Sequence, residues 1–306
     1  MNKHDSSHHR LISSENLEYC LAPLKQFQDI AFTVPDGACD THAHVVANDM
    51  KSYPMVENRS YTPHPATESD YLDMLDQTQM TRGVLVQISV YGTDNRYMLE
   101  VLSRHPDRLR GIAVVDADIS ENELLKMHEL GVRGLRINVL FGGGIGFDAM
   151  ERLAAKIKPL GWHMQFLMNA ADIPELLMPR LKKLPVIGVV DHMGHTPVAS
   201  GLESPAMQGL THLMQENGWW VKLSGAYRIS EHFPDFQDVN AWAKKLYMTA
   251  PKQCVWGSDW PHVSLTQMPD TGALLNQFPN WLVHPQDIEQ VLVKNPQQLY
   301  GFAELY

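Results

Sequence analysis

The stretch GACDTHAHV, residues 37–45, is an apolar run that ends in two histidines, His42 and His44. Seven further runs along the chain share this pattern, with apolar and β-branched residues first and a polar or reactive side chain at the end. Their continuous apolar character is typical of parallel strands that are covered on both faces. The seven runs are RGVLVQISV, RGIAVVDAD, VRGLRINVL, HMQFLM, VIGVVDH, WWVKLSG and CVWGSDWP.

Helix-like segments lie between these runs, and several start after Asp, Ser or Asn and stop at Gly or Pro. An eightfold alternation of strand and helix predicts an α/β fold of the (β/α)8 TIM barrel type, with a doubly wound open sheet as the competing architecture. The strand ends favour the barrel, because a barrel brings all of them to one face, where active sites lie. The polar residues at these ends are His42, His44, Gln87, Asp116, Arg136, Gln165, His192, Ser224 and Asp259.

The chain contains no low-complexity segment, no Gly/Ser linker and no short repeat. We therefore predict an N-terminal arm over residues 1–35, lying outside the barrel, and one catalytic barrel domain over residues 36–306.

The formal net charge of -10 argues against a nucleic-acid or anionic-membrane partner, since both select basic surfaces. A small molecule is the expected partner, and an anionic one stays possible because local arginines can override a weak overall field. We expect no signal peptide and no membrane span. The three cysteines form no CxxC pair, which suits reduced thiols in a cytoplasmic protein. A homo-oligomer is left open.

His42 and His44 are two residues apart, so in a strand both side chains point to the same face, here toward the barrel interior. Asp259 ends the last run, which a closed barrel places beside the first. A single buried histidine or aspartate is more often a hydrogen-bonded core group than part of a functional site. The coincidence of His42, His44, His192 and Asp259 at strand ends favours an active site.

The segments DTHAHV, GVLVQISVYGTDN, GVRGLRINV, GWHMQF, VVDHMG and WGSDWPH together resemble the amidohydrolase superfamily, over almost the whole chain after Asp36. SYTPH, YGTDN, HMG and VKLSGAYR resemble more closely its branch of lactonases that act on 2-pyrone-4,6-dicarboxylate and sugar-acid lactones. This resemblance implies a hydrolase of a carboxylate-bearing lactone, in the breakdown of aromatic compounds or sugar acids.

The resemblance also implies roles for individual residues. Asp259 is expected to be the general base that activates water, for which it must not be locked in a salt bridge. His42, His44 and His192 are expected to polarise the lactone carbonyl. The residues expected to bind the substrate are Arg136 and Arg228, as partners of its carboxylates, together with Tyr61 and Gln87.

Metal-binding members of the superfamily usually add a Lys or Glu from the fourth strand and a histidine from the fifth. Here these strands offer Arg136, which cannot ligate a metal, and Gln165, so a binuclear centre is not expected. The lactonase branch needs no metal, and we expect no required cofactor. The alternative is a mononuclear zinc site formed by His42, His44, His192 and Asp259.

The dicarboxylate lactonase has a second arginine shortly after the fourth strand, where this chain reads INVLFGGGIG. This difference indicates a lactone with one carboxylate, or with hydroxyls in place of the second. Three other functions remain open: a zinc-dependent decarboxylase of the aminocarboxymuconate semialdehyde type, a lactone isomerase that uses the same site, and a binding protein without catalysis.

Overall fold

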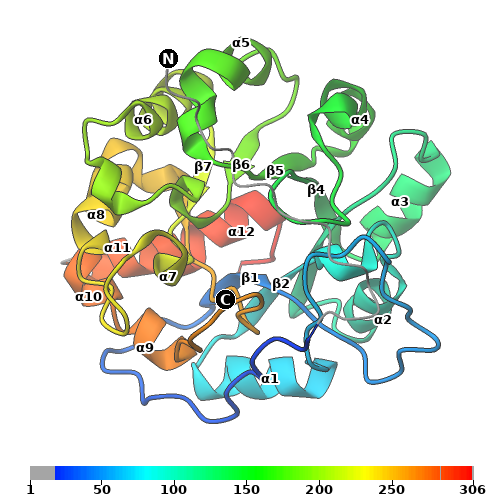
Figure 1. The fold of residues 1–306 in the computed structure, drawn as a ribbon, viewed down its shortest axis with the longest axis horizontal. Coiled ribbons are helices and arrows are strands. Elements are labelled where there is room, and N and C mark those ends of the chain that lie inside the picture. The colour runs from blue at the N-terminus through cyan, green and yellow to red at the C-terminus, as the bar shows by residue number, and fades with distance from the viewer. Residues whose placement is uncertain (1–17, 283, 305–306) are drawn as a thin grey trace.

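The computed structural model describes residues 18–282 and 284–304. Eight parallel strands follow one another around the sheet in the order β1 to β8, and helices surround them on the outside (Figure 1). The predicted (β/α)8 barrel is confirmed. The strands are β1 (Cys39–Ala43), β2 (Arg82–Val86), β3 (Leu109–Ala113), β4 (Val132–Asn138), β5 (His163–Leu167), β6 (Gly188–Val190), β7 (Trp220–Lys222) and β8 (Cys254–Val255).

The barrel closes between β1 and the segment that follows β8. The amide of His44 donates to the carbonyl of Trp260 over 2.8 Å, and the amide of Asp259 donates to the carbonyl of His42 over 2.8 Å. These bonds tie the first and last elements of the sheet together. His44 and Asp259 are therefore neighbours, as a closed barrel requires.

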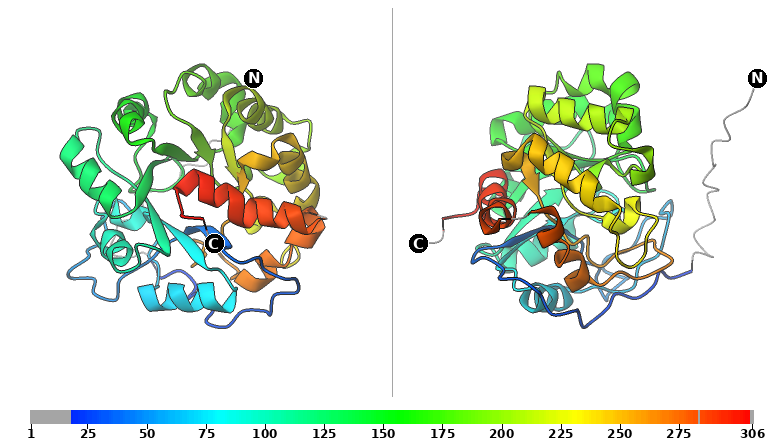
Figure 2. Two further views of the ribbon diagram at one scale, coloured as in Figure 1. Left: turned by 180° about the vertical axis from the view of Figure 1, so that it is seen from behind. Right: turned by 90° about the vertical axis from the view of Figure 1, so that its left-hand side faces the viewer.

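The helices surround the sheet and connect successive strands, and the last of them crosses one end of the barrel (Figure 2). They are α1 (Glu68–Gln77), α2 (Arg96–Arg104), α3 (Glu121–Glu129), α4 (Met150–Ile157), α5 (Met178–Leu181), α6 (Pro205–Asn217), α7 (Ala226–Ile229), α8 (Val239–Thr249), α9 (Thr271–Leu275), α10 (Phe278–Trp281), α11 (Pro285–Glu289) and α12 (Asn295–Tyr300).

Local capping signals explain where several of these helices begin and end. Thr67 before α1 and Ser120 before α3 each form a capping box with the acidic residue three positions later. Helix α6 begins after Ser204, whose hydroxyl accepts from the amide of Met207, and it ends at Gly218 in a left-handed conformation. These positions agree with the Ser and Gly signals of the sequence.

Helix α12 crosses one end of the barrel, as the view from behind shows (Figure 2). Tyr300 of α12 and Phe302 just beyond it pack with inward-facing residues of the first three strands, such as Val84 and Ile112. This apolar cluster closes the end of the barrel at which the strands begin. The buried polar side chains His42, His44 and Asp259 lie toward the other end.

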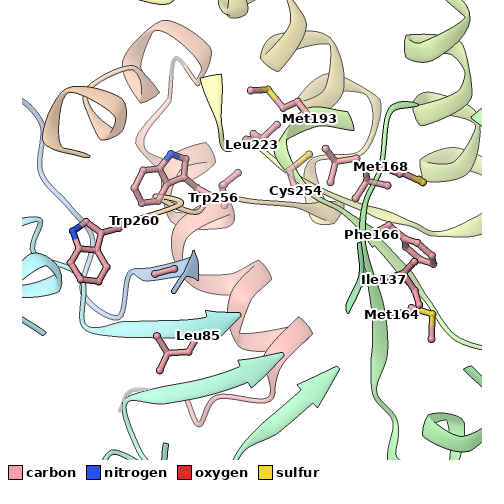
Figure 3. Close-up of a cluster of buried hydrophobic side chains, with 14 of the residues drawn as sticks. Leu85, Ile137, Met164, Phe166, Met168, Met193, Leu223, Cys254, Trp256 and Trp260 are labelled. Atoms are coloured by element: carbon pink, nitrogen blue, oxygen red, sulfur yellow. The ribbon is translucent and has the colours of Figure 1, made fainter. Parts of the chain in front are cut away.

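The main hydrophobic core lies between the strands and the surrounding helices. Figure 3 shows part of it, with Leu85, Ile137, Phe166 and Trp256 among its buried members. Outward-facing strand residues supply this core, so the strands are apolar on one face and mixed on the other.

Residues 18–35 run along the outside of the barrel near α1 and α9 (Figure 1). The amide of Gln28 donates to the carboxylate of Asp270, and the amide of Ala31 donates to Asn276 Oδ1 over 2.7 Å. The rest of the predicted arm, residues 1–17, lies outside the described residues. Within the described part of the chain, no helix has both the length and the apolar character needed to cross a membrane.

Candidate active site

A layer of buried polar side chains fills the barrel interior on the strand-end side of the apolar cluster that includes Tyr300 and Phe302. Arg136 and Gln165 are directly opposite each other in the pairing of β4 with β5. Both reach Asp191, which follows β6: Arg136 Nε and Gln165 Nε2 contact Asp191 Oδ2 over 3.2 and 3.1 Å. The strand ends thus converge on a carboxylate that is fully buried.

Lys222, the last residue of β7, belongs to the same buried layer. Its ammonium donates to the carbonyl of Thr41 over 2.8 Å and lies 3.6 Å from Asp191 Oδ1 and 3.3 Å from His42 Nδ1. Burial lowers the pKa of Lys222 to about 8. Burial alone would raise the pKa of Asp191, but His42, Lys222 and Arg136 hold it well below its usual range. A network of opposite charges therefore lies directly behind His42.

A second group of buried polar side chains surrounds Asp259, next to the network around Asp191. Asp259 Oδ1 faces three imidazole rings. The Nε2 atoms of His44 and His192 each lie 3.6 Å from this oxygen, and that of His42 lies 3.7 Å from it. These separations are too long for hydrogen bonds. All four side chains are at most 5% exposed, so one carboxylate oxygen and three ring nitrogens face one another in a site shielded from bulk solvent.

The other oxygen of Asp259 is fully engaged. Tyr227 donates its hydroxyl to Oδ2 over 2.6 Å, and Arg228 Nε donates to the same oxygen over 2.6 Å. Burial raises the pKa of Asp259, but the guanidinium of Arg228 and the nearby imidazoles hold it well below its usual range. The expectation that Asp259 avoids a salt bridge is therefore wrong. Its partner is Arg228, which the sequence predicts to bind the substrate.

A chain of hydrogen bonds continues outward from Tyr227. Since Tyr227 gives its only proton to Asp259, the Nδ1 of His262, 3.0 Å away, must be the donor to the tyrosine oxygen. The Nε2 of His262 then accepts from the hydroxyl of Thr271 over 2.8 Å. Burial lowers the pKa of His262 to about 3, so the ring stays neutral. This chain fixes the orientation of the Tyr227 hydroxyl.

The three imidazoles around Asp259 differ in the hydrogen-bond partner of their Nδ1 atoms. His44 Nδ1 faces the carbonyl of Val86 at 2.7 Å, and His192 Nδ1 faces the hydroxyl of Ser224 at 2.9 Å. His42 Nδ1 lies between Lys222, a donor, and Asp191, to which it is 3.3 Å distant. A neutral His44 must carry its proton on Nδ1, since a carbonyl only accepts. Its Nε2 is then an acceptor.

Tyr61 lies under the loop that follows β4. Its side chain is buried, its hydroxyl is 2.9 Å from Ser89 Oγ, and burial raises its pKa to about 12. The Gly-rich loop packs closely on this region: the amide of Gly142 donates to Ser60 Oγ, and a Cβ at Gly142 would lie 2.1 Å from the carbonyl oxygen of Asn58. Only glycine permits this approach, so the loop lies closed on the Tyr61 segment.

Gln87 and Asp116 belong neither to the network around Asp191 nor to the group around Asp259. The Nε2 of Gln87 donates to the carbonyls of Gly92 and Asp94, so this side chain holds the loop after β2. Its predicted role in substrate binding gains no support from these contacts. Asp116 is exposed, three residues beyond β3. The expectation that it lies with the other strand ends is wrong.

Several residues in the clusters were not singled out in the sequence. Asp191 immediately precedes His192, and Lys222 is a charged residue inside the apolar run WWVKLSG. Each was visible as a polar interruption of a buried strand, which is itself a signal. Tyr227 and His262 lie in loops or short helices, and nothing in the local pattern indicates that they meet at Asp259.

Two groups of residues could hold a metal ion. Their potential ligand atoms lie within 4.8 Å of one another, and the groups are His42, His44 and Asp259, and His42, Asp191 and His192. The Nε2 of His42 is buried and has no hydrogen-bond partner in the described part of the chain. These donors suit zinc, which binds imidazole and carboxylate ligands.

The barrel, with its inward-facing histidines and its aspartate after the last strand, is the arrangement expected of an amidohydrolase. The sequence profile of the Amidohydrolase family matches residues 39–302, and the chain belongs to this family. A curated relative, the 2-pyrone-4,6-dicarboxylate hydrolase of Comamonas testosteroni, is 33% identical over 287 residues, which cover 90% of this chain and 93% of the relative.

Two further similarities point the same way. The 4-sulfomuconolactone hydrolase of Hydrogenophaga intermedia is 32% identical over 290 residues, covering 92% of this chain and 94% of the relative. A crystal structure from Pseudomonas putida, proposed to be a 2-pyrone-4,6-dicarboxylic acid hydrolase, matches with a TM-score of 0.76 and 32% identity, covering 88% of this chain and 99% of that one. The predicted resemblance is confirmed, as is the prediction of an enzyme of the hydrolase class.

Proposed function

We propose that this protein hydrolyses a carboxylate-bearing lactone, with Asp259 as the general base. The observation that carries the proposal is the buried geometry in which Asp259 Oδ1 faces three imidazole Nε2 atoms at 3.6–3.7 Å. A reacting water and the lactone carbonyl can contact a base and hydrogen-bonding rings there at the same time. The lactones named for the curated relatives support this choice of substrate class.

In this mechanism a water molecule gives a proton to Asp259 Oδ1 while its oxygen attacks the lactone carbonyl carbon. The carbonyl oxygen becomes an oxyanion, which hydrogen-bond donors must stabilise. The ring C–O bond then breaks, and Asp259 returns the proton to the leaving oxygen. The product is the open-chain hydroxy acid or its keto tautomer.

The three histidines have different parts in this proposal. His44 accepts through Nε2 when it is neutral, because Val86 fixes its proton on Nδ1, so it orients the attacking water. His192 can donate through Nε2, because Ser224 can supply a proton to its Nδ1. His42 can donate likewise when Lys222 supplies the proton at its Nδ1. His42 and His192 are therefore the proposed donors to the oxyanion.

Arg228 couples substrate binding to the basicity of Asp259. Its guanidinium now holds Asp259 Oδ2, which keeps the carboxylate ionised but makes it a weak base. A substrate carboxylate that binds Arg228 shares this positive charge and thereby raises the basicity of Asp259. In this way the base becomes stronger only when the correct anion is bound. Arg136 supplies a second guanidinium, although Asp191 already engages it.

Zinc-dependent catalysis is the second candidate, because the donor set fits the metal. His42, His44 and Asp259 would hold the ion, with His192, 3.6 Å from Asp259, as the fourth ligand, and a bound zinc would lower the pKa of a bound water to about 7. We favour hydrolysis without a required metal, since an enol-lactone is an activated ester with a good leaving group. Zinc-dependent decarboxylation and lactone isomerisation remain the alternatives on the same residues.

The test is a screen of carboxylated lactones in which proton release reports hydrolysis, with and without a chelator. Our proposal requires turnover of at least one such lactone and no change on chelation. Loss of activity with chelator, restored by added zinc, would establish the metal-dependent alternative. Release of carbon dioxide from an aminocarboxymuconate semialdehyde substrate would establish the decarboxylase.

A further inference from the structure

The turn that follows β6 has an unusual backbone. Four consecutive residues lie in the left-handed region, with φ of 50° at His192, 51° at Met193, 84° at Gly194 and 49° at His195. Three of them are not glycine, so the turn is strained. Strained positions persist only where the surrounding structure fixes them, and they cluster at functional sites.

Two contacts with neighbouring elements and one hydrogen bond within the turn hold it in place. The indole of Trp242 donates to the carbonyl of Met193 over 3.2 Å, and the amide of His195 donates to the carbonyl of His192 over 2.9 Å. The hydroxyl of Thr196 donates to Asn169 Oδ1 over 2.8 Å. Met193 itself is fully buried in the main hydrophobic core (Figure 3). The turn is therefore a rigid support for the two histidines at its ends.

The first of these histidines faces Asp259, and the second has no assigned role. The ring centroid of His195 lies 6.5 Å from that of His192, so His195 is adjacent to the catalytic cluster. Its Nε2 is buried and has no hydrogen-bond partner among the described residues. A buried nitrogen without a partner is uncommon and calls for a ligand or water. The left-handed backbone would suit glycine or asparagine at least as well, so the turn itself does not require an imidazole.

We infer that His195 is a specificity residue whose Nε2 forms a hydrogen bond with an uncharged polar substituent of the lactone, a ring hydroxyl or carbonyl group. This inference rests on the proposed function. An imidazole bonds such groups as donor or acceptor, depending on its tautomer.

Charge supports an uncharged partner over a second carboxylate. A histidine ring has an ordinary pKa of about 6.5, so at pH 7 and above it is mostly neutral and offers no full charge to an anion. The Gly-rich loop after β4 has no cation either, as its sequence VLFGGGIG shows. The second polar group of the substrate is thus expected to be neutral.

The test compares two lactones that differ in their ring hydroxyls. 3,4-Dihydroxy-5-oxotetrahydrofuran-2-carboxylate has one carboxylate and two ring hydroxyls, whereas 5-oxotetrahydrofuran-2-carboxylate has the same ring and carboxylate and no ring hydroxyl. Wild-type protein should prefer the hydroxylated compound by roughly tenfold, the scale of a hydrogen bond to a neutral group. Titration calorimetry of both compounds in an Asp259→Asn background, in which turnover should be lost, gives a readout of binding alone.

Two variants separate the hydrogen bond from the fold. His195→Phe keeps a ring of similar size without hydrogen bonding, and it should abolish the preference mainly through KM. His195→Asn suits the left-handed backbone and keeps a polar group, so it should fold normally and retain part of the preference. His212→Phe, on the exposed face of α6, is the matched control and should change nothing.

The outcomes distinguish this inference from the proposal on which it rests. Equal losses on both lactones in His195→Phe and His195→Asn, or an unchanged preference, would overturn the role of His195 while leaving lactone hydrolysis intact. Absence of hydrolysis of every carboxylated lactone by the wild type would count against the proposed function. Discrimination that persists in calorimetry would then still support the contact with His195.

Discussion

Replacement of Asp259 by asparagine tests the centre of the proposed mechanism. The change preserves the size of the side chain but removes the proton acceptor, so kcat should fall by roughly 10² or more, the usual scale for loss of acid–base catalysis. It also removes the anionic partner of Arg228, which is 7% exposed and 2.6 Å from Oδ2. Removing one member of a buried ion pair costs about 3–5 kcal/mol, because the remaining charge stays buried.

The stability loss must be separated from the catalytic loss. For a chain of this size, such a cost lowers the midpoint of thermal unfolding by on the order of 5–15 °C. The double variant Asp259→Asn with Arg228→Met removes the unpaired guanidinium as well, so it should regain much of that loss. Its activity should stay at the level of the single variant or below it, since the base is still absent.

Three measurements decide the result: kcat on a lactone from the screen, the midpoint of thermal unfolding, and the zinc content of wild type and variants. The metal-free mechanism requires a large rate loss, equal zinc content in wild type and variant, and wild-type activity indifferent to chelator. A variant that keeps more than about a tenth of the wild-type kcat would refute the general-base role. Zinc lost in the variant together with zinc-restored activity would assign Asp259 and the histidines to a metal instead.

Three further predictions follow from the same geometry. Arg136→Met should raise KM far more than it lowers kcat, and it should lower the unfolding midpoint because Asp191 loses a buried partner; a collapse of kcat at constant KM contradicts the carboxylate-binding role. Gly257→Ala places a Cβ 2.5 Å from the Cβ of His42, so denaturant titration should show a loss of about 1–3 kcal/mol, and activity should fall with it. Three buried histidines bind protons between pH 6.5 and about 3 in the unfolded chain but not in the folded protein. The midpoint of thermal unfolding should therefore fall as the pH falls through this window. A midpoint that does not change with pH contradicts this prediction. The rings concerned are His163, His192 and His262, whose pKa burial lowers to about 3.

The sequence alone was sufficient to predict the barrel and the end of it at which the buried histidines and Asp259 meet. The reason is that both depend on local patterns: apolar runs alternate with capped helices, and reactive side chains stand where the runs stop. Once eight such runs close into a ring, His42, His44, His192 and Asp259 must come together, because parallel strands end at the same face. Their juxtaposition is a consequence of topology, and topology follows from the order of elements.

The partners of these residues depend on the tertiary structure. Asp259 follows β8 in a left-handed conformation, and its Oδ2 is taken by Tyr227 and Arg228 from a short helix after β7. Lys222 reaches His42 across 180 positions of sequence. Such contacts are set by loop backbone and side-chain rotamers, which no periodic pattern encodes. The sequence predicts a base outside any salt bridge and an arginine that binds the substrate, whereas the structure pairs Asp259 with Arg228. Two opposite charges brought together in a buried interior attract each other strongly, and neither residue alone reveals this pairing.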